Sequence, residues 1–313
     1  MLTIETIRFK GWKNNIRLSN ESIELVVTAD VGPRIIRCGF VNERNLLAEF
    51  TEQLGGTGEK NWMIRGGHRL WIAPECKSET YELDNHPVAL RKIKGGIRTI
   101  QEPGPLTGIQ KIMDIRLSDT TNEVTITHQL VNRGRKPRTI APWALTVMAP
   151  GGLCIIPLPV KVPHTANILP NQAWSLWSYT DFADGRWSFG SRYVFFRQSK
   201  KHGPGKIGIA HREGWTAYQL GEFLLAKSFD YIKGAIYPDG GVNFETYSDK
   251  RMLEVETLGP LITLAPGKSA KHVESWKLLK NTRPVKTEKD ADLIARQLRT
   301  GDPLSKAALP TPQ

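Results

Sequence analysis

Short alternating runs separated by turn residues constrain the fold of this chain more than any other feature. Examples are residues 22–30 (SIELVVTAD), 122–134 (NEVTITHQLVNRG) and 251–260 (RMLEVETLGP), each with β-branched residues at period two. The 28 glycines and 20 prolines lie between such runs, as the many turns of a β-sandwich require. Strand–helix alternation is missing, which disfavours a doubly wound parallel sheet. The sequence therefore predicts an all-β protein, a large antiparallel β-sandwich.

The composition changes near residue 282, where the last alternating run ends. The segment after it, TEKDADLIARQLRTG, has a capping Thr287, acidic residues in its first turn and Gly301 as a stop signal. We expect residues 1–281 to form one sandwich. Residues 282–313 should hold a short C-terminal helix and a poorly ordered tail.

The cysteines and the N-terminus indicate a reducing compartment. Cys38, Cys76 and Cys154 are far apart, odd in number and form no CxxC pair, which argues against a disulfide framework and a cysteine zinc site. The N-terminus is polar where a signal peptide needs an apolar segment, and no apolar run reaches membrane-spanning length. We expect a cytoplasmic protein without a membrane partner, either a monomer or a homodimer.

The formal net charge of +12 raises the question of nucleic acid binding. The basic residues are scattered, with only small groups at 133–138 and 268–272. The chain has no basic helix, zinc finger or aromatic-plus-basic RNA motif. We interpret the charge as a solvated basic surface and expect no nucleic-acid partner.

The common nucleotide, serine-hydrolase and zinc-protease motifs are missing: there is no Walker loop, GxGxxG, GxSxG or HExxH. A metal held by His68, Glu75 and His86 would have a ligand spacing that matches no standard motif. We therefore expect neither a cofactor nor a metal.

The segment RGGHRLWIAPE, residues 65–75, concentrates chemistry-bearing side chains. Its paired glycines permit a close approach of backbone or ligand. In an extended strand, Arg69 and Trp71 point to one face, while His68 points to the other face together with apolar neighbours. The segment is either a ligand-facing strand or a structural strand with a core histidine.

A second strand-like run, residues 251–260, carries Glu254 and Glu256 on one face. Two carboxylates on one face can hold hydroxyls by charge-assisted hydrogen bonds, and crowding would raise the pKa of one of them. Such a group can exchange protons near neutrality. The alternative is a solvent-exposed acidic stripe.

Five further residues are weaker candidates. Trp143 follows a proline in a predicted strand and is either a core residue or a stacking platform for a sugar. Arg34 lies at a turn-to-strand junction, from which it could reach a carboxylate or phosphate. Asn243 and Glu245 share a strand face after a tight turn. His128 stands in an apolar row and is more simply a satisfied core residue.

Taken together, these segments resemble the galactose-mutarotase-like superfamily, and more closely an uncharacterised domain-of-unknown-function family within it. The resemblance covers most of residues 20–280. It implies a supersandwich with the ligand on its concave face. The matching pieces are VGPRIIRCGFVNERNLLAEF, GGHRLWIAPE, GIQKIMDIRL, THQLVNRGRKPRTIAPWALTVMAPGG and EVETLGPLITLAPGKS.

In aldose mutarotases a glutamate on the closing strand acts as the base and a histidine as the acid. By motif position Glu256 matches that glutamate, with Glu254 as the alternative, and His68 is the candidate acid. The family's second histidine is missing here, because the strand APWALTVM has Trp143 near the expected position. This departure leaves room for binding without catalysis.

The sequence thus suggests a carbohydrate-active protein, an epimerase or mutarotase that uses Glu256 as base and His68 as acid. The alternatives are a non-catalytic sugar-binding or sensing module, and a lyase or hydrolase on the same fold. The expected ligand is a small carbohydrate, either neutral or carrying an acidic or phosphate group. The residues expected to bind it are Arg34, Arg69, Trp71, Glu75, Trp143, Asn243 and Glu254.

Overall fold

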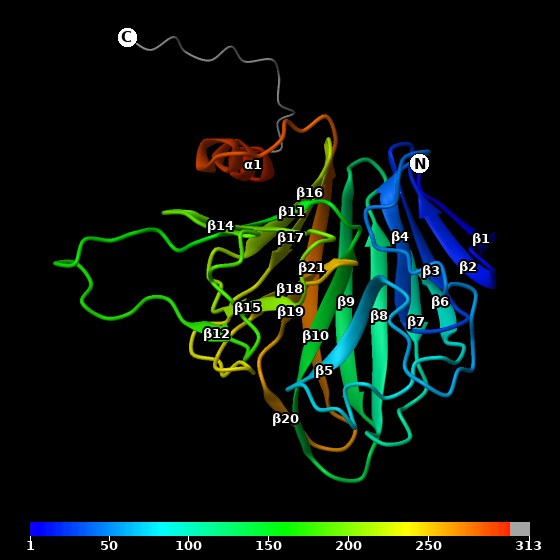
Figure 1. The fold of residues 1–313 in the computed structure, drawn as a ribbon. Coiled ribbons are helices and arrows are strands. Elements are labelled where there is room, and N and C mark those ends of the chain that lie inside the picture. Colours follow the sequence, from blue (N-terminus) through cyan, green and yellow to red (C-terminus); the bar gives the residue numbers. More distant parts are fainter. Residues whose placement is uncertain (301–313) are drawn as a thin grey trace.

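Two antiparallel sheets pack face to face in the computed structural model, which describes residues 1–300 (Figure 1). One sheet has eleven strands and the other ten, and all strand pairs are antiparallel. The eleven-stranded sheet has the order β1 (Thr3–Phe9), β2 (Trp12–Ser19), β3 (Ile23–Thr28), β4 (Arg34–Phe40), β5 (Gly67–Ala73), β10 (Arg138–Met148), β19 (Leu253–Leu258), β18 (Phe244–Ser248), β15 (Gly205–Ile209) and β12 (Trp174–Leu176), with β20 (Ile262–Leu264) paired to β10. The ten-stranded sheet has the order β13 (Trp187–Phe189), β14 (Tyr193–Arg197), β11 (Leu153–Pro157), β16 (Trp215–Leu220), β17 (Phe223–Phe229), β21 (Ser269–Leu279), β9 (Glu123–Asn132), β8 (Ile109–Leu117), β7 (Gly96–Ile100) and β6 (Ala89–Ile93).

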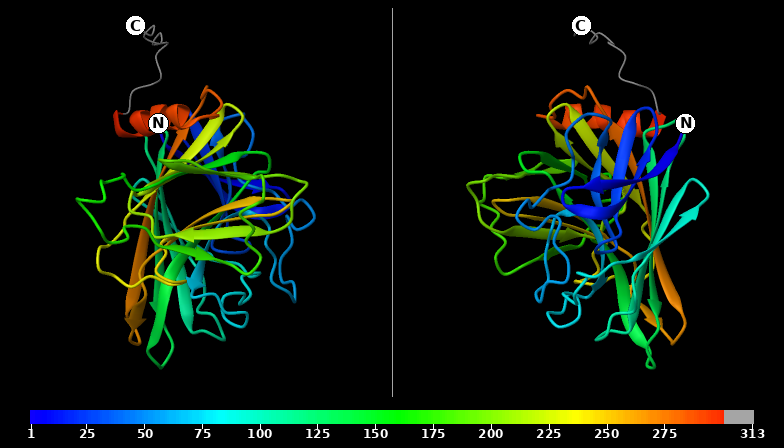
Figure 2. Two further views of the ribbon diagram at one scale, coloured as in Figure 1. Left: turned by 60° about the vertical axis from the view of Figure 1, so that its left-hand side comes forward. Right: turned by 90° about the vertical axis from the view of Figure 1, so that its right-hand side faces the viewer.

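The core lies between the sheets. It forms because apolar side chains alternate with polar ones along the strands and point inward. In β9, Val124, Ile126, His128 and Leu130 are buried, while Thr125, Thr127 and Gln129 between them are more exposed. β21 alternates in the same way along most of its length. One contiguous cluster of apolar side chains from both sheets fills the interior. The predicted antiparallel sandwich is confirmed, and Figure 2 shows its two layers from the side.

The register at the centre of the eleven-stranded sheet aligns several polar residues in one row. β10 lies between β5 and β19, so Leu145 pairs with Arg69 on one side and with Glu256 on the other. Glu256 pairs in turn with Glu245 of β18. Because paired residues share a face, strands that are far apart in the sequence present these side chains together.

The predicted C-terminal helix is α1 (Glu288–Thr300). Thr287 caps it: its hydroxyl accepts a hydrogen bond from the Asp290 amide, and the Asp290 carboxylate accepts one from the Thr287 amide. Ala291 and Ile294 dock it on the ten-stranded sheet. Gly301 and the expected tail lie outside the described residues. Within residues 1–300, no helix is long and apolar enough to cross a membrane.

Candidate functional site

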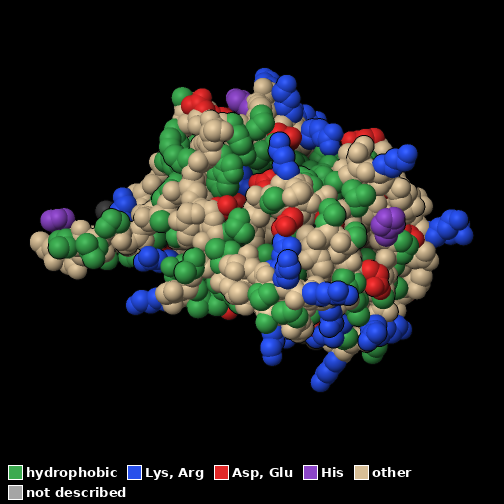
Figure 3. Space-filling model, turned by 90° about the horizontal axis from the view of Figure 1, so that it is seen from below, with side chains coloured by type: hydrophobic (Ala, Val, Ile, Leu, Met, Phe, Trp, Pro, Cys, Tyr) green, Lys and Arg blue, Asp and Glu red, His purple; other side chains and the backbone are tan. Residues whose placement is uncertain are grey.

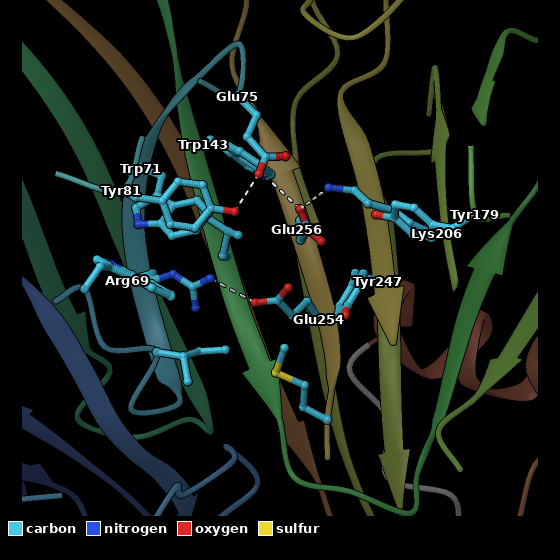
Figure 4. A pocket seen from close by; sticks show the side chains of 14 residues that line it. Arg69, Trp71, Glu75, Tyr81, Trp143, Tyr179, Lys206, Tyr247, Glu254 and Glu256 are labelled. Carbon is cyan, nitrogen blue, oxygen red and sulfur yellow. Dashed lines mark hydrogen bonds and ion pairs between the residues drawn. The ribbon is translucent and has the colours of Figure 1, made fainter. Parts of the chain in front are cut away.

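A pocket of about 230 Å³ opens on the outer face of the eleven-stranded sheet (Figure 4). Its floor comes from β5, β10 and β19. Its walls come from the segments before and after β5, from the segment after β12, and from β15 and β18. Lysine and arginine side chains are scattered over the face of the molecule seen in Figure 3, interspersed with acidic and apolar ones. The pocket is lined by Trp62, Ile64, Arg69, Trp71, Glu75, Tyr81, Trp143, Leu145, Tyr179, Lys206, Tyr247, Met252, Glu254 and Glu256.

Two buried carboxylates of β19 point into this pocket, each with its own cationic partner. Glu254 Oε1 accepts a hydrogen bond from Arg69 Nη2 at 3.0 Å. Glu256 Oε2 accepts hydrogen bonds from Trp143 Nε1 at 3.0 Å and from Lys206 Nζ at 3.2 Å. Within residues 1–300, Glu256 Oε1 is buried and has no hydrogen-bond partner. The two glutamates are therefore neither a solvent-exposed stripe nor equivalent to each other.

Burial and neighbouring charges shift the pKa values in this cluster. Burial, reinforced by the Glu256 carboxylate and opposed by Arg69, raises the pKa of Glu254 to about 7. Burial also raises the pKa of Glu245, whose carboxylate lies 2.6 Å from Lys206 Nζ. For Lys206, burial lowers the pKa, but the carboxylates of Glu256 and Glu245 outweigh it and the pKa is raised overall. The site therefore holds a protonated lysine, paired with Glu245 and Glu256, and a separate carboxyl group, Glu254, that titrates near neutrality.

Aromatic rings form much of the pocket wall. The rings of Trp71 and Trp143 lie 5.4 Å apart between centroids, and Trp62 lies 5.1 Å from Trp71. The Arg69 guanidinium stacks on Trp71, with its central carbon 4.3 Å from the ring centroid. At the rim, the exposed Glu75 accepts a hydrogen bond of 2.6 Å from the hydroxyl of Tyr81. The pocket thus combines flat apolar surfaces with charged hydrogen-bonding groups.

His68 does not lie in this pocket. Its side chain points to the opposite face of β5, between the two sheets, where it is fully buried. Its ring nitrogens contact Thr146 Oγ1 at 2.8 Å and His128 Nε2 at 2.7 Å. The expected pairing of His68 with Glu256 in one cleft is therefore wrong. Side chains alternate between the two faces of β5, and Arg69 and Trp71 are the ones that point into the pocket.

Arg34 and Asn243 also lie outside the pocket. Arg34 is fully buried, pairs with Asp84 at 2.6 Å and donates hydrogen bonds to the carbonyls of Ile64 and Gly66. Asn243 exchanges side-chain hydrogen bonds with the backbone of His211. Both are structural polar residues that anchor neighbouring segments. The other candidates from the sequence line the pocket, namely Arg69, Trp71, Glu75, Trp143, Glu254 and Glu256.

A buried polar network lies directly behind the pocket strands, between the sheets. The His272 carbonyl can only accept, so His128 donates to it from Nδ1 and uses Nε2 as an acceptor for His68. The Thr146 hydroxyl then donates to His68 Nδ1, while its oxygen accepts from Lys227 Nζ at 2.8 Å. This arrangement satisfies every ring nitrogen of His68 and His128 with neutral imidazoles.

The same network contains the one metal-compatible group of the described residues, formed by His68, His128 and Glu274, whose ligand atoms lie within 4.8 Å of one another. The Glu274 carboxylate is already paired with Lys227 at 2.7 Å, and it accepts a hydrogen bond of 2.7 Å from Trp276 Nε1. A metal would have to displace Lys227 and break the hydrogen bond between the histidines. The donor set therefore fits a structural hydrogen-bond network better than a metal.

The most important site residue absent from the candidates of the sequence is Lys206. It begins a recognisable strand-like run, KIGIAHREG, but nothing in that run indicates which strand lies beside it. The tyrosines of the wall, Tyr81, Tyr179 and Tyr247, come from separate segments and carried no motif.

Comparisons with known proteins bear on the fold. No protein-family model matches the sequence, and no curated protein matches it. Among solved structures, the Slr1438 protein from Synechocystis sp. PCC 6803 matches with a TM-score of 0.58 at 10% identity, covering 88% of this chain and 99% of that one. A galactose mutarotase-like protein from Lactobacillus casei ATCC 334 matches with a TM-score of 0.54 at 10% identity, covering 85% and 100%.

A candidate aldose 1-epimerase from Escherichia coli K12 also matches, with a TM-score of 0.54 at 14% identity, covering 90% of this chain and 100% of that one. The TM-scores and the coverage establish the architecture. At identities this low, the activity has to be argued from the site itself. The order of the strands, the two-sheet architecture and these matches agree. The chain therefore has the galactose mutarotase-like fold.

Proposed function

We propose that this protein binds one small sugar in the pocket of β5, β10 and β19 and interconverts its anomers. The observation that carries the proposal is the pair of buried carboxylates, Glu254 and Glu256, each held by its own cation within an aromatic-lined pocket. Carboxylates bind sugar hydroxyls by charge-assisted hydrogen bonds, and indole rings provide apolar surfaces for the C–H faces of a sugar. The galactose mutarotase-like fold supports this class of ligand as an analogy.

The chemistry requires proton transfer at two oxygens. Glu256 Oε1, which is free of other partners within residues 1–300, would take the proton of the anomeric hydroxyl as the bond between the anomeric carbon and the ring oxygen breaks. Glu254 would give a proton to the ring oxygen. Because burial raises its pKa to about 7, Glu254 can carry that proton near neutral pH. Ring closure on the other face of the new carbonyl returns both protons, so the cycle balances without a cofactor.

The charges of the pocket favour a neutral ligand over an acidic or phosphorylated one. Arg69 pairs with Glu254, and Lys206 pairs with Glu256 and Glu245, so neither cation brings an uncompensated positive charge to the pocket. Glu75 adds a further carboxylate at the rim. The volume of about 230 Å³ lies below the range of roughly 300–1,000 Å³ that is typical of drug-sized ligand pockets, which supports a single sugar over a polymer.

A second candidate function is a sugar-binding or sensing module without turnover. It is favoured by the lining of the pocket, which includes no histidine side chain, whereas the mutarotase mechanism expected from the sequence uses one. In this case Glu254 and Glu256 would hold hydroxyls without transferring protons.

Anomer exchange of D-galactose and D-glucose, followed by NMR, separates the two candidates. We expect the protein to accelerate the exchange and Glu256→Gln to lower the acceleration by about 10²- to 10⁴-fold, the usual contribution of a general base. Glu43→Gln, at an exposed site outside the pocket, is the matched control and should retain the wild-type rate. Calorimetric binding without accelerated exchange would select the sensing module. Wild-type exchange in Glu256→Gln would overturn the assignment of the base.

A further inference from the structure

Lys206 occupies a cage of two carboxylates and two indole rings. Its Nζ lies 2.6 Å from Glu245 Oε2 and 3.2 Å from Glu256 Oε2. It also lies 4.8 Å from the ring centroid of Trp143 and 4.5 Å from that of Trp177. These four partners come from β18, β19, β10 and the segment after β12, so the ammonium joins four parts of the molecule at the pocket. Figure 4 shows its contact with Glu256.

The Lys206 ammonium lies between two carboxylates that would otherwise repel each other. Glu245 and Glu256 are directly opposite each other on β18 and β19, and both are fully buried. Like charges at directly opposed positions of a sheet destabilise it, and burial strengthens the repulsion. A single cation between the two carboxylates relieves that repulsion, and the faces of the indole rings favour a cation at this place.

The two carboxylate oxygens of Glu256 differ in their hydrogen bonds. Oε2 accepts from Lys206 Nζ and from Trp143 Nε1, so it is held from two directions. Oε1 is left without a partner in the described part of the chain. The cation thus fixes the orientation of the carboxylate through one oxygen while the other stays available.

We infer that Lys206 is a positioning residue, which holds Glu256 Oε2 beside the Trp143 indole so that Oε1 faces the ligand. The inference rests on the proposed sugar site and extends it to a residue that does not itself need to touch the sugar. Lys206 is a poor proton donor at neutral pH because its two carboxylate neighbours stabilise its charged form. Its contribution is therefore electrostatic and geometric.

The first test is structural and needs no sugar. Crystal structures of Lys206→Met and Lys206→Arg are compared with that of the wild type. We expect the Glu256 carboxylate to leave the Trp143 indole in Lys206→Met and to remain on it in Lys206→Arg. A Glu256 carboxylate that stays in place in Lys206→Met would overturn the inference, whether or not the wild type acts on a sugar.

The second test uses the rate of D-galactose anomer exchange. We expect Lys206→Met to lower the rate at least tenfold, because Glu256 Oε2 then loses one of its two hydrogen-bond donors and the carboxylate is no longer held in place. Lys206→Arg should restore most of the rate. Lys271→Met removes the same charge from an exposed site on β21 and is the matched control.

The two arms separate the failure of the inference from the failure of the proposed function. A wild type that neither binds nor converts a sugar contradicts the function, and the crystal structures still decide whether Lys206 orients Glu256. A wild-type exchange rate in Lys206→Met would contradict the positioning role. Lys206→Gln, a neutral polar replacement, takes the place of Lys206→Met if thermal unfolding shows that the methionine variant does not fold.

Discussion

Glu254 and Glu256 lie two residues apart on one strand, yet the molecule gives them different surroundings. Glu254 pairs with Arg69, whose guanidinium also lies over two indole rings. Glu256 is held by Lys206 and the Trp143 indole. Pairs of titratable groups with different environments are typical of sites in which one carboxyl donates a proton and the other accepts one. The arrangement therefore suits acid–base chemistry on a ligand that lies between them.

The role of Glu254 as proton donor predicts a specific pH dependence. Burial holds its pKa at about 7, so the fraction of protonated donor falls as the pH rises above 7. We expect wild-type anomer exchange to fall about tenfold per pH unit well above that value. Glu254→Gln should lower the exchange rate by about 10²- to 10⁴-fold and should lack this limb. The same alkaline limb in the residual activity of Glu254→Gln would show that another group donates the proton.

Strand alternation in the sequence predicted correctly which side chains share a face, and it was a better guide than the family resemblance. It separated His68 from Arg69 and Trp71, whereas the resemblance paired His68 with Glu256. Arg34 and Asn243 have suitable chemistry but are occupied by Asp84 and by the backbone of His211.

The contribution of Lys206 could not be predicted from the sequence in the same way. Its importance depends on β15 lying two strands from β19 with β18 between them. Strand order of this kind is decided by packing over the whole chain, and local patterns do not contain it.

Strands β10 and β19 each carry polar residues on both faces. One face carries Trp143 and Glu256 into the pocket, and the other carries Thr146 and Thr257 into the buried polar network. Partners from β5, β9, β17 and β21 complete the network. The network thus fixes the pocket strands against the ten-stranded sheet.

The ion pair of Lys227 and Glu274 is the charged centre of this network, and both side chains are fully buried. We expect Lys227→Met to lower the free energy of unfolding by about 3–5 kcal/mol, because it leaves the Glu274 carboxylate buried without its cation. Glu274→Gln should have a similar cost. The double variant should cost clearly less than the sum of the two single variants, since no unpaired charge remains. Urea unfolding of the four proteins measures this, and additive costs would show that the two charges do not depend on each other.

The elements themselves were largely predictable. Alternating β-branched runs indicated the strands, and the capping signal at Thr287 indicated α1. The sequence did not indicate that β10 pairs with both β5 and β19, which come from distant parts of the chain. Pairing strands that are so far apart in the sequence costs loop-closure entropy, and the core shared by both sheets offsets that cost.

For the whole molecule, burial makes stability depend on pH through its histidines. Burial lowers the pKa of His128 to about 4 and the pKa of His211 and His272 to about 3. A histidine with a lowered pKa in the folded state contributes stability above its unfolded pKa of about 6.5, and that stability is lost as the pH falls towards the folded value. Glu254 acts in the opposite sense, because its raised pKa lets the folded state take up a proton first as the pH falls below 7.

His211 gives the clearest test of this dependence, since burial is the dominant cause of its shift. Its ring packs near Phe229 and Phe244, outside the network of the other buried histidines. Between pH 7.5 and 5.5, the wild type should lose about 1.4 kcal/mol more free energy of unfolding than His211→Gln, whose side chain does not titrate. Between pH 7.5 and 8.5 the difference between the two proteins should stay constant, because histidine is neutral in both states there. Stability curves that stay parallel down to pH 5.5 would mean that His211 takes up its proton in the folded state.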